Sequence, residues 1–174
     1  MLIGDTLAAN AQARPHAPGL IFGERTLSWR DLNAGANRVA NALVKLGVRP
    51  GDRVVYPLEN SVEFVELFFG LAKIGVIGAP VLANAVANEI AHTIVDLDAK
   101  FAICGAGARV ALKDIQSTCP SLAGIVGIGE HDFGLDYTRL CADALDSEPE
   151  FVWSHDPDAE LSVKYTSGTT GTPK

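Results

Sequence analysis

The chain has 174 residues, 48% hydrophobic and 20% charged, which is the balance of an ordinary globular domain and not of a disordered segment. Fourteen basic against 21 acidic side chains give a formal net charge of −7, which argues against general affinity for nucleic acid or an anionic membrane. A local phosphate site is not excluded, because backbone amides and one or two cations can hold a phosphate group.

The cysteines and the apolar stretches indicate where in the cell the protein is expected to be. Cys104, Cys119 and Cys141 show neither a CxxC pair nor a histidine at metal-ligand spacing, so we expect no disulfide framework and no metal site. The first 15 residues lack a basic region and contain Asp5, so we expect no export signal. Residues 67–83, the longest apolar stretch, are broken by a lysine, glycines and a proline. We therefore expect a cytoplasmic protein with no transmembrane segment.

The first elements predicted along the chain are a hairpin and an amphipathic helix. Residues 20–22 and 26–28 are β-prone and flank a glycine, which favours a hairpin. Ser28 can then cap a helix together with Asp31, and Gly47 can end that helix in a left-handed conformation. The apolar face of the helix repeats every three or four residues, at Trp29, Leu32, Ala36, Val39, Leu43 and Leu46.

Strands and helices are then predicted to alternate as far as residue 145. The predicted strands are 53–58, 76–81, 101–104 and 124–128. The predicted helices are one capped by Asn60 with Glu63 and stopped by Gly75, then 89–97, 109–118, and one from Asp136 to Leu145. This alternation predicts an α/β fold with a mostly parallel, open doubly wound sheet and flanking helices.

The last part of the chain contains an acidic connector, a predicted strand and a polar loop. Residues 146–160 carry several acidic side chains and two prolines, so we interpret their charge as solvated surface. Leu161, Val163 and Tyr165 alternate with polar residues, which predicts a half-covered strand over 159–165.

The loop at 165–174 has the composition that a polyphosphate requires. Glycine lets backbone N–H groups turn inward, hydroxyl groups donate to phosphate oxygens, and a lysine offsets the charge. The loop does not fit the Walker pattern, and Pro173 directly before Lys174 argues against a following helix. By composition alone, a flexible linker that binds nothing stays an alternative.

The string YTSGTTGTPK at 165–174 resembles the signature loop of the adenylate-forming superfamily, which includes acyl-CoA synthetases, luciferases and adenylation domains of peptide synthetases. The resemblance extends upstream through TLSWRDLNAGANRVANAL and LGVRPGDRVVYPLENSVEFVELFFGLAKIGVIGAPV, and through residues 80–104. It implies that residues 1–174 are part of the N-terminal AMP-binding domain of such an enzyme. One departure is Lys164, where these strands are more often uncharged.

The resemblance implies a reaction and a set of binding residues. In this superfamily a carboxylate attacks the α-phosphate of ATP to give an acyl-adenylate and pyrophosphate, and in the CoA ligases CoA then displaces AMP. Mg²⁺ is expected with the nucleotide. The implied pyrophosphate-binding residues are Thr166, Ser167, Gly168, Thr169, Thr170, Gly171 and Lys174. The resemblance assigns no catalytic residue and no metal ligand within residues 1–174, since the family's adenine, ribose and acyl sites and its C-terminal domain lie beyond them.

Several alternatives stay open at this point. The upstream sequence is more similar to fatty-acyl ligases than to peptide-synthetase modules, but aryl acids are possible substrates. Residues 1–174 alone are expected to be inactive. A non-catalytic remnant or binding module of the same fold is the main alternative, and a nucleotide-binding regulator with an unrelated phosphate loop is a further one.

Overall fold

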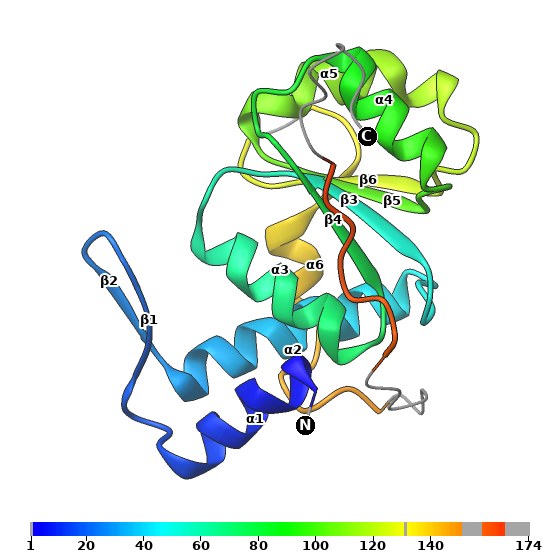
Figure 1. The fold of residues 1–174 in the computed structure, drawn as a ribbon. Coiled ribbons are helices and arrows are strands. Elements are labelled where there is room, and N and C mark those ends of the chain that lie inside the picture. The colour runs from blue at the N-terminus through cyan, green and yellow to red at the C-terminus, as the bar shows by residue number, and fades with distance from the viewer. Residues whose placement is uncertain (1, 131, 151–157, 166–174) are drawn as a thin grey trace. The chain divides into compact units, whose positions relative to one another are not determined.

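The computed structural model describes residues 2–130, 132–150 and 158–165. The chain divides into two compact units, each built from segments far apart in sequence (Figure 1). Residues 1–50, 60–76 and 140–161 form the first, here called the helical unit. Residues 51–59, 77–139 and 162–174 form the second, here called the sheet unit.

The helical unit begins with a helix and the predicted hairpin. Helix α1 (Ile3–Ala13) is followed by the antiparallel strands β1 (Pro18–Phe22) and β2 (Arg25–Ser28). Gly23 at the turn has a φ of 57°, a conformation that glycine adopts without strain. The hairpin, drawn in blue, extends away from the neighbouring helices of its unit in Figure 1, and its prediction is confirmed.

Helix α2 (Trp29–Lys45) starts and ends where the sequence predicts. The Ser28 hydroxyl accepts a hydrogen bond from the Asp31 amide at 3.2 Å, and Gly47 has a φ of 92°. The apolar face is confirmed in its central part, while Trp29 and Leu46 at its ends are half-buried. Its buried members are Leu32, Ala36, Val39 and Leu43.

Helix α3 (Val62–Lys73) differs from the prediction at its start. The cap is Ser61 and not Asn60, because the Ser61 hydroxyl accepts from the Phe64 amide at 3.1 Å, three residues along. Small residues make the close contact with α2: a Cβ on Gly70 would lie 2.9 Å from the Ala36 carbonyl oxygen. The predicted stop at Gly75 is confirmed by its φ of 64°.

Polar side chains of α2 bind the segment that begins the predicted acidic connector. Asn37 donates to the Asp146 carbonyl oxygen at 2.9 Å, and Asn41 donates to the carbonyl oxygen of Leu145 at 2.9 Å. These bonds hold residues 145 and 146 against α2. Helix α6 (Tyr137–Ala142) ends before Leu145, where the prediction placed its end.

Glu148, in the predicted acidic connector, is exposed to solvent and also pairs with side chains of α2 and α3. Its carboxylate accepts from Lys73 Nζ at 2.5 Å and from Asn33 Nδ2 at 2.8 Å, and the Lys73 side chain is only 4% exposed. Burial alone would raise the pKa of Glu148, but the hydrogen bonds from Lys73, Asn33 and Asn37 hold it below its ordinary value. Glu148 is therefore an exposed acidic residue, as the interpretation of the connector expects, and it also pairs with a buried lysine.

The sheet unit is built on five parallel strands in the order β4-β3-β5-β6-β7. The chain moves outward from β3 to β4 and then returns past β3 to β5, which is the strand order of a doubly wound sheet. Four of the strands coincide closely with predicted ones, whereas β7 was not predicted. The strands are β3 (Arg53–Pro57), β4 (Ile77–Val81), β5 (Phe101–Cys104), β6 (Gly124–Gly127) and β7 (Leu135–Asp136).

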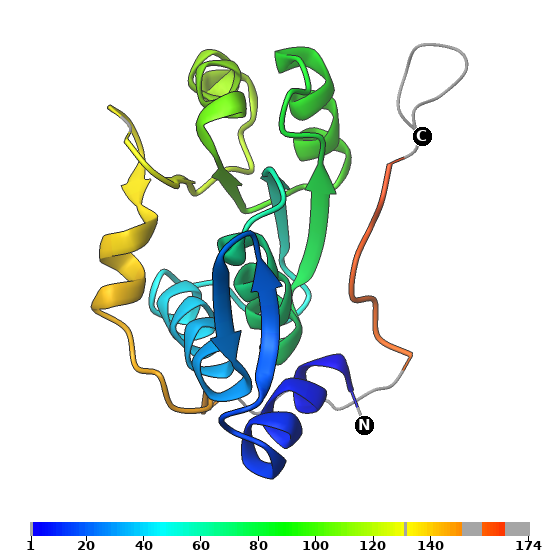
Figure 2. The same cartoon turned by 90° about the vertical axis from the view of Figure 1, so that its left-hand side faces the viewer.

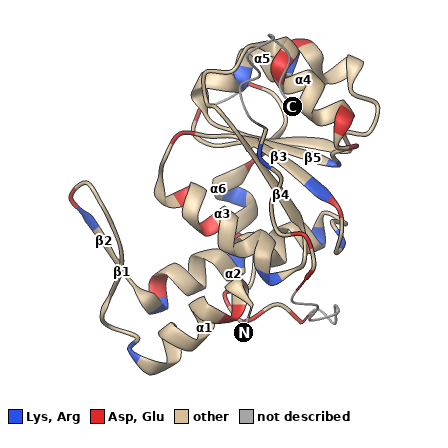
Figure 3. Ribbon diagram, viewed as in Figure 1, with Lys and Arg blue, Asp and Glu red and all other residues tan. Residues whose placement is uncertain are grey.

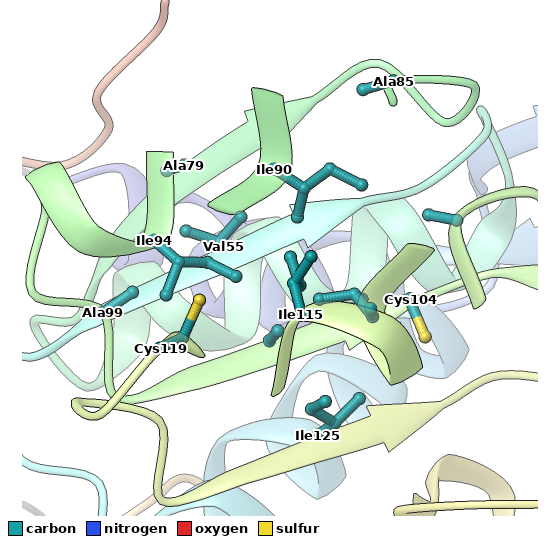
Figure 4. Packing of buried hydrophobic residues seen from close by; sticks show 13 residues of the cluster. Val55, Ala79, Ala85, Ile90, Ile94, Ala99, Cys104, Ile115, Cys119 and Ile125 are labelled. Atoms are coloured by element: carbon teal, nitrogen blue, oxygen red, sulfur yellow. The ribbon is translucent and has the colours of Figure 1, made fainter. Parts of the chain in front are cut away.

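Two helices of the sheet unit, α4 (Ala87–Asp96) and α5 (Arg109–Ile115), lie side by side (Figures 1 and 2). Short 3-10 turns flank α5, η1 (Ala106–Ala108) before it and η2 (Gln116–Thr118) after it. Figure 4 shows the apolar core of this unit, in which side chains of α4 and α5 meet those of the strands. The α/β class with a parallel sheet and flanking helices is therefore confirmed.

Charged side chains are spread over most elements of the described chain. Figure 3 shows Lys and Arg on β2, α3, β3 and α5, with Asp and Glu interspersed. The described residues contain no helix that is both long and apolar enough to cross a membrane.

Candidate nucleotide-binding site

The predicted phosphate loop follows directly after the last residue that the structure describes, Tyr165. The binding residues predicted from the sequence are Thr166, Ser167, Gly168, Thr169, Thr170, Gly171 and Lys174, and all of them lie outside the described residues. The described part of the candidate site is therefore the segment 162–165 and the elements of the sheet unit that hold it.

The segment lies along the outer edge of β4, but the predicted strand over 159–165 is wrong. Ser162 forms a single parallel bridge with Gly78, and the Val163 amide donates to the Gly78 carbonyl oxygen at 3.0 Å. Alternate residues of a strand point their N–H groups to the same edge, so Pro80 would supply the next donor. Proline has no N–H, and the ladder stops after one bridge.

Tyr165 makes the contacts that hold the end of the segment. Its hydroxyl donates a hydrogen bond to Asp96 Oδ2. Its ring meets the His92 imidazole edge to face, with centroids 6.2 Å apart and planes at 76°. His92 and Asp96 are four residues apart on α4, so one face of this helix presents both groups. The segment is thus held both at the strand edge and at the helix.

The electrostatics at Tyr165 keep its hydroxyl protonated. Burial, then the hydrogen bond to Asp96 and the charge of that carboxylate, raise the pKa of Tyr165 to about 12. The phenol therefore stays a donor throughout the physiological pH range. The neighbouring Lys164 is exposed to solvent, as its departure from the family pattern suggested.

Sequence reasoning missed His92 and Asp96. Both lie on a helix that the sequence predicts, but their partner Tyr165 is 69 residues beyond Asp96. A single sequence carries no signal for that pairing. The spacing of four residues indicates only that the two side chains share a helix face.

A separate depression in the sheet unit contains two acidic residues, Glu130 and Asp136. It has a volume of about 500 Å³ and is lined by Gly129, Glu130, Asp136 and Thr138. Asp136 Oδ1 accepts from the Arg139 amide at 2.6 Å, which caps α6 as predicted. The Asp136 carboxylate in the depression thus has a structural role as a helix cap. His131, which follows Glu130 in the sequence, lies outside the described residues.

Cysteines and metal-ligating groups in the described chain do not form a site. Cys104 and Cys119 are buried, and burial raises the pKa of the Cys104 thiol to about 11, so this thiol stays protonated and unreactive. No group of three or more His, Cys, Asp or Glu among the described residues could hold a metal ion.

Comparison with known proteins identifies the family. The model of the AMP-binding enzyme family matches residues 7–174, nearly the whole chain. The chain belongs to the AMP-binding enzyme family. The parallel sheet, the flanking helices and the YTSGTTGTPK string are therefore features of an adenylate-forming enzyme domain.

Curated relatives of the chain are acyl ligases. It is 33% identical to fatty acid–[acyl-carrier-protein] ligase ScoC of Streptomyces coeruleorubidus, over 97% of this chain and 31% of the relative. It is 35% identical to long-chain-fatty-acid–CoA ligase FadD13 of Mycobacterium tuberculosis, over 85% of this chain and 28% of the relative. The chain thus spans about a third of the length of the relatives that it matches.

Solved structures agree with this family. The anthranilate CoA ligase AuaEII, solved in complex with anthranoyl-AMP, superposes with a TM-score of 0.92 and 30% identity. That match covers 100% of this chain and 34% of the other chain. The superposition agrees with the observed arrangement of the parallel sheet and its helices.

Proposed function

We propose that this chain is part of an ATP-dependent carboxylate–CoA ligase that acts on a fatty acid or a related carboxylic acid. The observation that carries the proposal is the match of the AMP-binding enzyme family over residues 7–174, which includes the hydroxyl- and glycine-rich loop. The named relatives, a fatty-acyl CoA ligase among them, support the acyl substrate.

In the proposed reaction, a carboxylate oxygen of the acid attacks the α-phosphorus of ATP. A new oxygen–phosphorus bond forms, the bond to the β-phosphate bridging oxygen breaks, and pyrophosphate leaves with the electron pair. The CoA thiolate then attacks the acyl carbon and releases AMP, giving the thioester. The loop would act on the first step, where negative charge develops on the departing phosphates.

The proposed roles within the loop follow from its chemistry. Thr166, Ser167, Thr169 and Thr170 would donate hydroxyl hydrogen bonds to phosphate oxygens. Gly168 and Gly171 would allow backbone amides to face the phosphates, and Lys174 would supply positive charge. A donor aimed at developing charge contributes about 10²–10³-fold to the rate. Mg²⁺ is expected to arrive with ATP, and we assign it no ligand.

A specific observation favours a second acceptor for the acyl group. The relative ScoC is named a fatty acid–[acyl-carrier-protein] ligase, and it matches 97% of this chain. The thiol that accepts the acyl group could therefore belong to a carrier protein and not to CoA. The similarity to an anthranilate CoA ligase likewise keeps aryl acids on the list of substrates to be tested.

The test is ATP–pyrophosphate exchange by the full-length protein with a panel of fatty, short-chain and aryl acids. We expect exchange that depends on one class of acid, and thioester formation with either CoA or a phosphopantetheine carrier. Residues 1–174 alone are expected to give no exchange. Absence of exchange with every acid, by a folded full-length protein, would favour the alternative of a non-catalytic module of the same fold.

A further inference from the structure

The segment before the phosphate loop has too few backbone bonds to fix its own position. Beyond the bridge between Ser162 and Gly78, Pro80 removes the next donor along the β4 edge. Each backbone residue that is free to move retains about 1–2 kcal/mol of conformational entropy. A side-chain contact near the end of the segment is therefore needed if the following loop is to start from one position.

Tyr165 supplies that contact, and it lies next to the first residue of the loop. Its hydroxyl reaches Asp96 and its ring reaches His92, on two successive turns of α4. Two different kinds of interaction, a hydrogen bond to a carboxylate and an edge-to-face ring contact, restrain both the tip and the plane of one side chain. Asp96 is an exposed residue of α4, and its carboxylate accepts the hydrogen bond from Tyr165.

We propose that Tyr165 is a positioning residue for adenylation, which acts by tying the start of the phosphate loop to Asp96 and His92 of α4. This inference rests on the proposed function. Donors act on a transition state only when they are held in place, and a displacement of about 1 Å can cost about 10²-fold in rate. Tyr165 would act through the loop and would touch neither ATP nor the acid.

The first test removes only the hydroxyl, in the full-length protein, by Tyr165→Phe. We expect kcat for ATP–pyrophosphate exchange to fall about tenfold or more, while KM for the carboxylic acid changes less than twofold. Asp96→Ala should give a similar loss, and the double variant should be no worse than Tyr165→Phe alone, because both changes break one interaction. Asp114→Ala, which removes an exposed carboxylate from α5, is the matched control and should leave kcat unchanged.

Failure of this inference is distinguishable from failure of the proposed function. An active wild type with kcat unchanged in both Tyr165→Phe and Asp96→Ala would overturn the positioning role and leave the ligase function intact. Losses that multiply in the double variant would also overturn it, since the two side chains would then act independently.

Hydrogen exchange tests the contacts of Tyr165 independently of activity, even if the wild type shows no ATP–pyrophosphate exchange. The Val163 amide is bonded to the Gly78 carbonyl oxygen, so its hydrogen exchange reports whether the segment stays on β4. We expect Tyr165→Phe to speed exchange at Val163 at least about fivefold, which corresponds to a loss of about 1 kcal/mol of protection. Equal protection in wild type and variant would contradict the proposal.

Discussion

Lys73 and Glu148 form the most buried ion pair in the described helical unit, and the two residues come from distant parts of the chain. The Lys73 side chain is 4% exposed while that of Glu148 is 52% exposed, so the lysine is the partner that has lost its water. A buried ammonium needs a carboxylate and further acceptors to stay charged. Lys73 lies in the last turn of α3, and its partner Glu148 lies 75 residues further along the chain.

Replacing Lys73 by Met should loosen the segment that Glu148 holds. We expect Lys73→Met to lower the protection of residues 145–150 against hydrogen exchange by about 1–3 kcal/mol, because a hydrogen bond to a charged group is lost. Lys113→Met is the matched control, because Lys113 and its partner Asp132 are 53% and 71% exposed. Its effect should stay below about 1 kcal/mol.

The same pair has a defined pH dependence. Because the pKa of Glu148 lies below its ordinary value of 4.5 in the folded chain, its stabilising effect is present above that pH. The effect is lost as the pH falls and the carboxylate becomes protonated. The difference between wild type and Lys73→Met should therefore shrink below about pH 4.5, and a constant difference down to pH 3 would contradict this account.

At the scale of elements, the contact between α2 and α3 encloses a carboxyl group. Glu66 on α3 lies against Gly35 of α2, where a Cβ would come within 2.1 Å of Glu66 Oε1. Burial, and then the neighbouring charge of Glu63, raise the pKa of Glu66 to about 7, although Arg25 and Arg38 act to lower it. The helix pair thus favours the protonated form of this side chain.

Glu66→Gln should change the pH dependence of stability. A carboxyl whose pKa is higher in the folded state stabilises the fold at low pH, and that contribution is lost as the pH rises from about 4.5 to about 7. We expect the wild-type Tm to fall over this interval through Glu66, and the Glu66→Gln variant to fall less and to melt higher at pH 8. Parallel Tm profiles for the two proteins between pH 4.5 and 8 would contradict it.

Most elements could be predicted from the sequence because their signals are local. The caps at Ser28 and Asp136, the left-handed glycines and the apolar periodicity all act within a few residues. The prediction is wrong where residues far apart in the sequence determine the structure of a segment. The strand at 159–165 fails because of Pro80 on another strand. Helix α6 ends before Leu145, and the segment that follows it is bound by Asn37 and Asn41 of α2.

At the scale of the whole molecule, the fold class followed from the alternation of strands and helices, but the strand order did not. The reversal between β4 and β5 depends on which strands pair, and β7 is too short to be recognised by periodicity. Family membership could be inferred from one ten-residue string at 165–174, and the family match over residues 7–174 confirms it. The roles of His92 and Asp96 required the structure.

The central claim is that the loop after Tyr165 binds the phosphates of ATP, and titration calorimetry of Mg²⁺-ATP with the full-length protein tests it most directly. Three proteins suffice: wild type, Lys174→Ala, and Lys45→Ala, which removes an exposed lysine at the end of α2 and serves as the control. The account predicts measurable binding by wild type, at least about tenfold weaker binding by Lys174→Ala, and binding by Lys45→Ala within about twofold of wild type. Absence of binding by the wild type, or equal affinity in Lys174→Ala and wild type, would contradict it.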